Sequence, residues 1–211
     1  MKARMTERLK PESTALLFFD MLNGHVKKDD AATKARYAPV IAAAMRLLEA
    51  ARRSRLVVMY AAAHHRPDNA TSAQLVTDTD NRLRSIPAGH PRDLKPAVAA
   101  GTWEAQVIDE LKPQPQDYMI PKFRWSAFHQ TYLDLALRNR NIDTLLISGG
   151  STDVGVASTA YAARDLDYNL VVVSDACTSP EEDNHRQFMR RVFPRMARVR
   201  TADEVLRMLA G

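Results

Sequence analysis

Cysteine and long apolar runs are both scarce in this sequence, and each absence excludes a class of protein. The one cysteine, Cys177, has no second cysteine to pair with, so no disulfide forms within the chain. The longest apolar runs are pieces such as "TLLI" and "LVVV", far short of the roughly 18 to 20 residues that cross a bilayer. The opening stretch, "MKARMTERLK", lacks the apolar segment of a secretory signal. These features predict a soluble cytoplasmic protein with no membrane partner.

Aromatic residues make up only 7% of the chain, whereas 45% of its 211 residues are hydrophobic and 26% are charged. This balance fits one globular domain over residues 1–211 with a full core, because two domains sharing this length would each be small.

Basic residues are in excess, with a net charge of +5 and six arginines within residues 185–200. Such a cluster is typical of nucleic-acid binding when it forms a patch. Here Phe188, Met189, Val192 and Phe193 recur at helical spacing, so we interpret the arginines as the solvated face of an amphipathic helix. Steering of an anionic substrate and contact with another subunit stay open as alternatives. No nucleic-acid partner is expected.

Short apolar runs alternate with helical patterns along the chain. Six of these runs are predicted to be strands buried on both faces, at residues 14–20, 55–60, 117–120, 143–148, 169–175 and 197–200. An alternation of strand and helix favours a single-domain, three-layer α/β/α fold, in which helices cover both faces of a mainly parallel six-stranded sheet.

The helices between these runs carry their own signals. An apolar stripe predicts the first helix at Val40, Ile41, Ala44, Met45, Leu47 and Leu48, and a second stripe predicts a helix after Ser126 at Leu133, Leu135, Ala136 and Leu137. Thr201 and Glu204 have the spacing of a capping box, which predicts the start of the last helix.

Residues 62–100 form the longest stretch without a clear strand or helix pattern, and they contain four prolines and three histidines. A connection of this length is unusual inside a compact domain. We interpret it as a lid or pocket wall, with disorder and a subunit-contact arm as the alternatives.

Ligands of open α/β sheets bind beyond the carboxyl ends of the strands, so the residues that follow each strand are the candidates for chemistry. Asp20 follows the first predicted strand, Lys122 the third, and Ser151 and Thr152 the fourth. Each also has an ordinary interpretation: Asp20 as a turn carboxylate, Lys122 as a surface charge, and the two hydroxyls as helix caps. A helix that starts after the fourth strand would present free N–H groups to an anion.

Three segments together resemble the isochorismatase-like hydrolase superfamily, also called the cysteine hydrolases, over about residues 12–206. They are "TALLFFDMLN", the stretch from "GTWEAQVIDELKPQPQD" through "IPKFRWSAF" to "STDVGVAST", and "YNLVVVSDACTS". The resemblance implies a six-stranded parallel sheet with a catalytic acid at Asp20 and a catalytic lysine at Lys122. It places the usual nucleophilic cysteine at Gly155, and it implies a buried, inert role for Cys177.

The glycine at the nucleophile position is compatible with three functional hypotheses. True isochorismatases resemble this chain in having glycine there and a "K-x-R-aromatic-SAF" segment, and they hydrolyse a vinyl ether without a covalent intermediate. That resemblance implies Asp20 as the acid, Lys122 and Arg124 as carboxylate binders, and Gly155 as room for the substrate. The alternatives are an amidase or ureide hydrolase that has lost its cysteine, which "STDVGV" favours, and a ligand-binding pseudoenzyme.

Besides Arg124, three residues are predicted to bind the substrate: Val154, Trp125 and His65. Some members of the superfamily bind a metal through an Asp-x-His pair, but Ala62 and Ala63 precede the histidines here, so we expect no metal and no cofactor. One of His64 and His65 is expected to line the pocket. The resemblance implies a homo-oligomer that acts on a small molecule.

Overall fold

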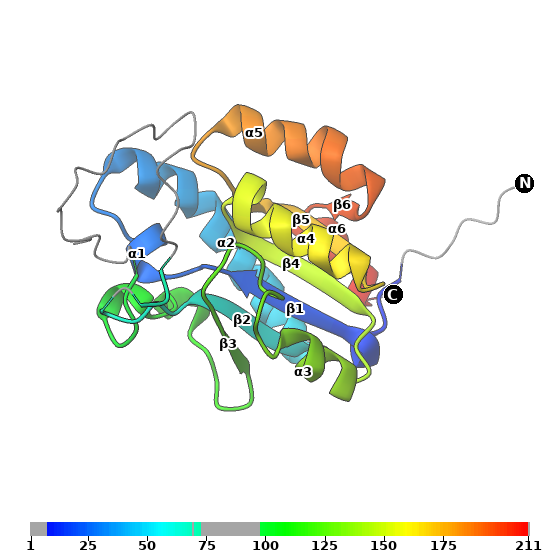
Figure 1. Cartoon of the computed structure of the whole chain (residues 1–211). Helices are drawn as coiled ribbons and strands as arrows, with labels where there is room; N and C mark the ends of the chain where they lie inside the picture. The colour runs from blue at the N-terminus through cyan, green and yellow to red at the C-terminus, as the bar shows by residue number, and fades with distance from the viewer. Residues whose placement is uncertain (1–7, 69, 73–97, 211) are drawn as a thin grey trace, which may run out of the picture.

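The computed structural model describes residues 8–68, 70–72 and 98–210, and its centre is a parallel sheet of six strands (Figure 1). The strands are β1 Thr14–Phe19, β2 Val57–Ala63, β3 Tyr118–Lys122, β4 Thr144–Gly150, β5 Asn169–Thr178 and β6 Arg198–Arg200. Their order is β3-β2-β1-β4-β5-β6, so the chain reverses its direction across the sheet between β1 and β4. The predicted fold is confirmed, and this reversal marks the point where open α/β sheets bind ligands.

The α-helices are α1 Asn23–Val26, α2 Ala31–Arg53, α3 Leu133–Asn139, α4 Ala157–Asp165, α5 Glu182–Gln187 and α6 Ala202–Ala210. Shorter turns are η1 Pro11–Ser13, η2 Trp103–Ala105, η3 Asp109–Leu111, the π-helical η4 Thr152–Val156 and η5 Phe188–Val192, and η6 Phe193–Arg195. In Figure 1, α3 and α4 lie in front of the sheet and α2 and α6 behind it, which gives three layers.

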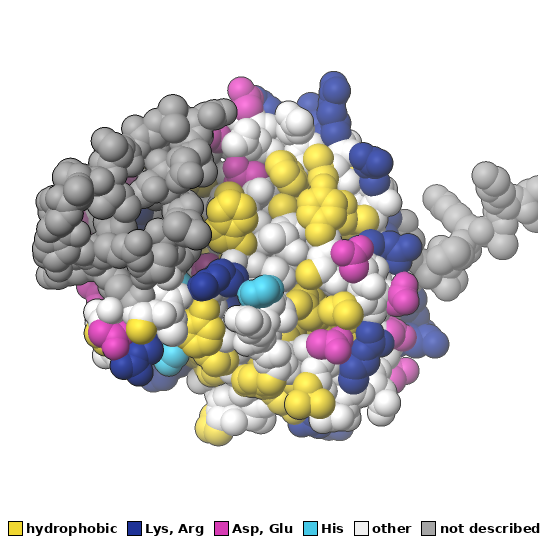
Figure 2. Space-filling model, in the orientation of Figure 1, with side chains coloured by type: hydrophobic (Ala, Val, Ile, Leu, Met, Phe, Trp, Pro, Cys, Tyr) yellow, Lys and Arg dark blue, Asp and Glu magenta, His cyan; other side chains and the backbone are white. Residues whose placement is uncertain are grey.

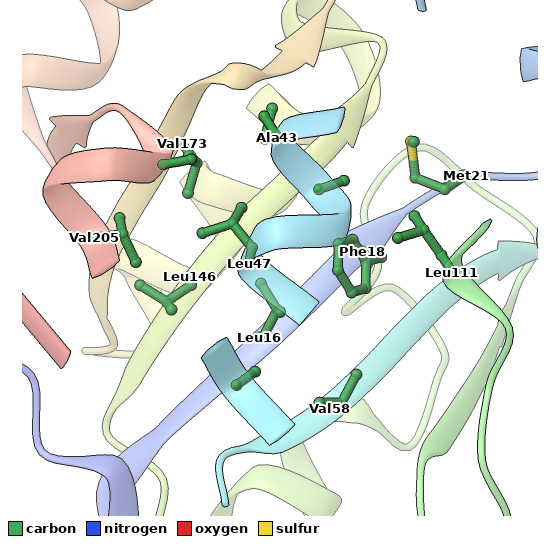
Figure 3. Packing of buried hydrophobic residues seen from close by; sticks show 14 of the residues in the cluster. Leu16, Phe18, Met21, Ala43, Leu47, Val58, Leu111, Leu146, Val173 and Val205 are labelled. Atoms are coloured by element: carbon green, nitrogen blue, oxygen red, sulfur yellow. The ribbon is translucent and has the colours of Figure 1, made fainter. Parts of the chain in front are cut away.

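Alternation along β1 divides its side chains between two cores. Leu16 and Phe18 belong to the core under α2 and α6, where Figure 3 shows them beside Leu47 of α2. Ala15, Leu17 and Phe19 belong to the opposite core, under α3 and α4. The last residue of β1, Phe19, therefore points toward the layer that contains α4.

Capping contacts fix the helix starts next to the sheet. Asp30 caps α2, because its carboxylate accepts a hydrogen bond of 2.7 Å from the Thr33 amide. The predicted capping box at the last helix is confirmed: the Thr201 amide donates to Glu204 at 2.7 Å, and the Glu204 amide donates to the Thr201 hydroxyl at 3.3 Å.

Two boundary predictions and one prediction of burial need correction. The helix after Ser126 begins only at Leu133, because residues 126–132 form turns. Leu135 in that helix is 62% exposed and Met45 in α2 is 45% exposed, so neither contributes to the core stripe that contains it. Strand β5 continues to Thr178, which places Cys177 inside the strand rather than after it.

The stretch predicted as a long loop over residues 62–100 begins later than expected. Ala62 and Ala63 are the last residues of β2 and pair with Pro121 and Lys122 of β3. Residues 69 and 73–97 lie outside the described part of the chain, and with them most of the predicted lid. Where the description resumes, Ala99 pairs with His65 through an isolated parallel bridge.

The surface over α3 and α4 carries hydrophobic side chains in separate patches between charged ones (Figure 2). Among the described residues, the large exposed hydrophobic ones are Met45, Trp103, Met119, Trp125, Tyr132, Leu135 and Tyr161. In the described part of the chain, no helix has both the length and the apolar character needed to cross a bilayer.

Candidate active site

Asp20 and Lys122, predicted to meet although about half the chain separates them, form a buried ion pair. Lys122 Nζ lies 2.7 Å from Asp20 Oδ2, and the two side chains are only 7% and 12% exposed. The pair sits where β1 and β3 end, on either side of the end of β2. Burying two charges is costly and seldom raises stability, so such a pair at the carboxyl edge of the sheet points to chemistry.

The backbone of Asp20 is strained, and two hydrogen bonds to the end of β2 hold it in place. Its φ of +48° lies in the left-handed region, which aspartate tolerates better than most residues. The Asp20 amide donates to the Ala61 carbonyl at 2.9 Å, and Asp20 Oδ1 accepts from the Ala63 amide at 2.9 Å. These bonds aim Asp20 Oδ2 at Lys122, as expected of strain kept at a functional position.

The turn after β4 approaches the end of β1 closely. A Cβ on Gly149, whose φ is +125°, would lie 2.0 Å from the Phe19 carbonyl oxygen, so only glycine fits there. The chain then enters the π-helical turn η4, in which the Val156 amide donates to the Ser151 carbonyl at 3.1 Å.

Side chains from two segments stabilise this turn. Asp153 accepts hydrogen bonds from the Ser151 and Ser179 hydroxyls and from Asn184 Nδ2. Burial raises the pKa of Asp153, but these bonds together outweigh it and leave the pKa lowered. The Ser151 hydroxyl therefore binds the Asp153 carboxylate rather than capping the helix, and Thr152 Oγ1 lies 2.9 Å from His185 Nδ1.

Gly155 lies against the ring of Phe19, and this corrects the expectation that the glycine leaves room for a substrate. A Cβ on Gly155 would lie 2.1 Å from Phe19 Cε1 and 2.4 Å from Phe19 Cζ. The ring therefore fills the space in which any side chain at position 155 would begin. Lys122 Nζ lies 4.5 Å from the centre of the same ring, so the aromatic side chain links Gly155 to the ion pair.

A cavity of about 350 Å³ opens beside the pair. Its lining includes the predicted residues Asp20, Lys122, Trp125, Val154 and Gly155. The segments that follow β1, β3, β4 and β5 all contribute residues to its lining, as expected of a site at the carboxyl edge of the sheet. Trp125 is 66% exposed and stands at its rim.

Two predicted residues do not line this cavity. Arg124 Nη1 donates to the carbonyls of Thr71 and Phe123, at 2.9 and 2.6 Å. His65 stacks edge-on against Phe123, with ring centres 6.2 Å apart, and its buried Nδ1 has no hydrogen-bond partner among the described residues. Their roles in substrate binding stay predictions.

Sequence reasoning missed the wall formed by the segment after β1. His25, Lys28, Arg36 and Tyr37 all line the cavity. Burial lowers the pKa of His25, with Asp20 opposing this shift and Lys122 and Lys28 adding to it, so its ring is neutral at pH 7. The one available signal was the position of His25 and Lys28 shortly after Asp20, and it does not extend to Arg36 and Tyr37, which lie within α2.

A larger cavity, of about 640 Å³, lies beside the edge strand β3 and is lined by His64, Met119, Pro121 and parts of residues 101–113. Its lining includes Asp109 and Lys112, but no ion pair joins these two residues, so we place the candidate site in the smaller cavity, which contains the Asp20–Lys122 pair. His64 lines this larger cavity, whereas His65 belongs to the described lining of neither of these two cavities. No group of three or more metal-binding side chains occurs within the described residues.

Lowering the pH from 7 to 5 is expected to lower the melting temperature. Burial depresses the pKa of His25, His65 and His185 below 6.5, so below about pH 6.5 the unfolded chain binds more protons than the folded one. The free energy of unfolding therefore decreases as the pH falls, and each kcal/mol lost lowers the melting temperature by about 2–4 °C. Thermal unfolding at several pH values measures the slope, and His185→Gln should flatten it. A melting temperature that rises on acidification would contradict this expectation.

The chain is similar to characterised and uncharacterised proteins of one family. A family model described as the isochorismatase domain matches residues 14–204. The ureidoacrylate amidohydrolase RutB of Pseudomonas savastanoi pv. phaseolicola is 31% identical over 176 residues, which cover 80% of this chain and 72% of RutB. The uncharacterized isochorismatase family protein YecD of Escherichia coli O157:H7 is 44% identical over 93 residues, 44% of this chain. The chain spans about half the length of the first curated relatives it matches, 50% and 54%.

Solved structures give the same result for the fold. An isochorismatase family protein from Burkholderia thailandensis superimposes with a TM-score of 0.80 at 30% identity, over 97% of this chain and 98% of that one. N-carbamoylsarcosine amidase from Thermoplasma acidophilum superimposes with a TM-score of 0.69 at 29% identity, over 90% and 97%. Because the matching family model runs from the first residue of β1 into α6 and includes the whole edge that carries Asp20 and Lys122, the chain belongs to the isochorismatase family.

Proposed function

We propose that this protein is a hydrolase of small carboxylate-bearing molecules that uses Asp20 and Lys122 and has no thiol nucleophile. The observation that carries the proposal is the buried 2.7 Å pair beside a cavity of about 350 Å³. The space where a nucleophilic side chain at position 155 would begin is filled by Phe19, so the reaction must proceed without one.

Vinyl-ether hydrolysis suits such a site. Asp20, in its acid form, protonates the terminal vinyl carbon and becomes a carboxylate. Water then adds to the oxocarbenium ion and gives one of its protons to the Asp20 carboxylate. The resulting hemiketal collapses to pyruvate and an alcohol. A substrate carboxylate near Lys122 favours the acid form of Asp20, because it competes for the ammonium and places a second negative charge beside the carboxylate.

Hydrolysis of a C–N bond is the second candidate, and the similarity to RutB and to N-carbamoylsarcosine amidase favours it. In that reaction Asp20 would accept a proton from an attacking water, since Gly155 has no side chain to attack the carbonyl. A third possibility is a pseudoenzyme that binds a ligand and releases no product.

A product assay separates these candidates. The protein is incubated with isochorismate, ureidoacrylate and N-carbamoylsarcosine, and pyruvate and ammonia are measured. Pyruvate supports vinyl-ether hydrolysis, and ammonia supports the C–N reaction. Binding without either product, measured by thermal shift with the same compounds, would favour the pseudoenzyme and count against catalysis.

A further inference from the structure

The segment from α1 into α2 forms one wall of the cavity. The positively charged side chains that line the cavity outnumber the carboxylates that line it. Lys28, Arg36 and Lys122 face a single lining carboxylate, that of Asp20, and Lys122 already pairs with it. Lys28 and Arg36 are therefore in excess within the described lining. An excess of one charge around a partly enclosed space attracts ligands of the opposite charge.

Arg36 is poorly satisfied by the protein itself. Its Nε is buried and has no hydrogen-bond partner in the described part of the chain. Its Nη2 makes one long bond, of 3.4 Å, to the Thr33 hydroxyl. A guanidinium carries five N–H donors, and buried donors without partners are costly and rare. A ligand that accepts these bonds would explain why the residue stands there.

The neighbouring carboxylates are engaged elsewhere. Asp29 pairs with Lys34 at 2.5 Å, and Asp30 accepts the capping bond from the Thr33 amide. Asp30 attracts Arg36 and Lys28 only through space, as the weaker contributors to its lowered pKa after the bonds to Thr33. No carboxylate of this segment therefore occupies the Arg36 donors.

Tyr37 adds a neutral partner on the same wall. Its ring is buried, its centre lies 5.4 Å from Arg36 Cζ, and it lines the cavity. A Cβ built on Gly150 would lie 3.1 Å from its hydroxyl, which places that hydroxyl at the start of the turn after β4. Tyr37 therefore connects the cationic wall with the Gly155 side of the cavity.

We propose that Arg36, assisted by Lys28, binds the carboxylate group of the substrate and so selects carboxylates over neutral molecules. This inference rests on the proposed function and adds Arg36 and Lys28 to Lys122 as the groups that attract the substrate carboxylate. The carboxylate lies against the α1–α2 wall, away from Arg124, and the bond that is broken lies toward Asp20. Arg36 is a specificity-determining residue, and Asp20 remains the group that transfers the proton.

The test measures binding of benzoate and benzamide, two probes of nearly equal shape that differ in charge. Isothermal titration is carried out on the wild type, Arg36→Gln, Lys28→Gln and Arg53→Gln. Arg53 lies on the same helix and carries the same charge outside the cavity, where it pairs with Glu49. We expect the wild type to prefer benzoate about tenfold, and Arg36→Gln to lose about tenfold in benzoate affinity alone. Lys28→Gln should lose about threefold, and Arg53→Gln should change less than twofold.

Two further variants exclude a structural role for Arg36. Arg36→Gln should melt at or above the temperature of the wild type, because it removes a buried Nε that has no hydrogen-bond partner among the described residues. Arg36→Lys, which keeps the charge, should recover most of the benzoate affinity. Equal losses in Arg36→Gln and Arg53→Gln, unchanged benzoate binding in Arg36→Gln, or no preference for benzoate in the wild type would each overturn the inference.

This binding test is independent of turnover. If product forms but the benzoate affinity is the same in the wild type and in Arg36→Gln, the inference fails and the proposed function stands. If benzoate binding depends on Arg36 but no compound is hydrolysed, the proposed function fails and the carboxylate site stands.

Discussion

Asp20→Asn will reduce kcat by about 1000-fold, within the usual contribution of general acid–base catalysis. Asparagine tolerates the left-handed backbone found at φ +48° and can still accept the bond from the Ala63 amide. It cannot transfer a proton to or from a substrate. The rate is measured with whichever compound the product assay identifies, at a temperature well below the melting point of each variant.

Two controls show whether a lost rate has a cause other than the missing proton transfer, such as a disturbed backbone or a less stable fold. Asp167→Asn changes an exposed aspartate that also has a left-handed backbone, at φ +64°, and its activity should equal that of the wild type. Asp20→Asn leaves the buried ammonium of Lys122 without its partner, which costs about 3–5 kcal/mol. Adding Lys122→Met removes that charge and should restore stability but not activity. Wild-type turnover in folded Asp20→Asn would refute acid–base catalysis by this residue.

Gly155→Cys, introduced alone, will destabilise the fold by about 1–3 kcal/mol and will not create a useful nucleophile. The new Cβ would overlap the Phe19 ring, whose Cε1 lies 2.1 Å away. The ring cannot turn aside easily, because Phe19 is 1% exposed and has Lys122 over its face. The free energy of unfolding is measured by denaturant titration.

Phe19→Val should relieve this overlap, although by itself it leaves a cavity and destabilises the protein by about 2–4 kcal/mol. In the double variant the two losses should cancel in part, with a favourable coupling of at least about 1 kcal/mol. A thiol reagent can follow the new cysteine without interference, since burial raises the pKa of Cys177 to about 12. Strictly additive losses would show that Phe19 and Gly155 do not compete for space. Ammonia release that appears only in the double variant would favour a C–N hydrolase origin of the site.

The sequence was sufficient to predict the sheet and the ion pair for physical reasons. Strands buried on both faces leave continuous apolar runs, and each of the six runs corresponds to an observed strand. The parallel arrangement then brings their carboxyl ends to one edge, where Asp20 and Lys122 meet. Strand ends were less accurate, because β2 and β5 continue past their predicted ends into residues that include several alanines, which are not enriched in strands.

The remainder of the site depends on contacts between distant segments. Alternation along β1 places Phe19 on the face of α4, but only coordinates show its ring reaching Gly155. Lys28 and Arg36 belong to a polar stretch that, from sequence alone, looks like an ordinary solvated surface. Their position over the cavity depends on how α2 lies across the sheet, which no local pattern specifies. The direction of Arg124 could not be predicted either, because its spacing in the "KFRWSAF" segment does not reveal that its guanidinium donates to the Thr71 carbonyl.

The fit between Phe19 and Gly155 also limits the routes by which a lineage could gain or lose a thiol here. A chain that acquires the cysteine first must survive an overlap with the ring, and a chain that shortens the ring first must survive a hole in its core. Each intermediate is less stable than the present chain. Selection for stability alone therefore preserves the glycine, whether or not the present reaction requires it.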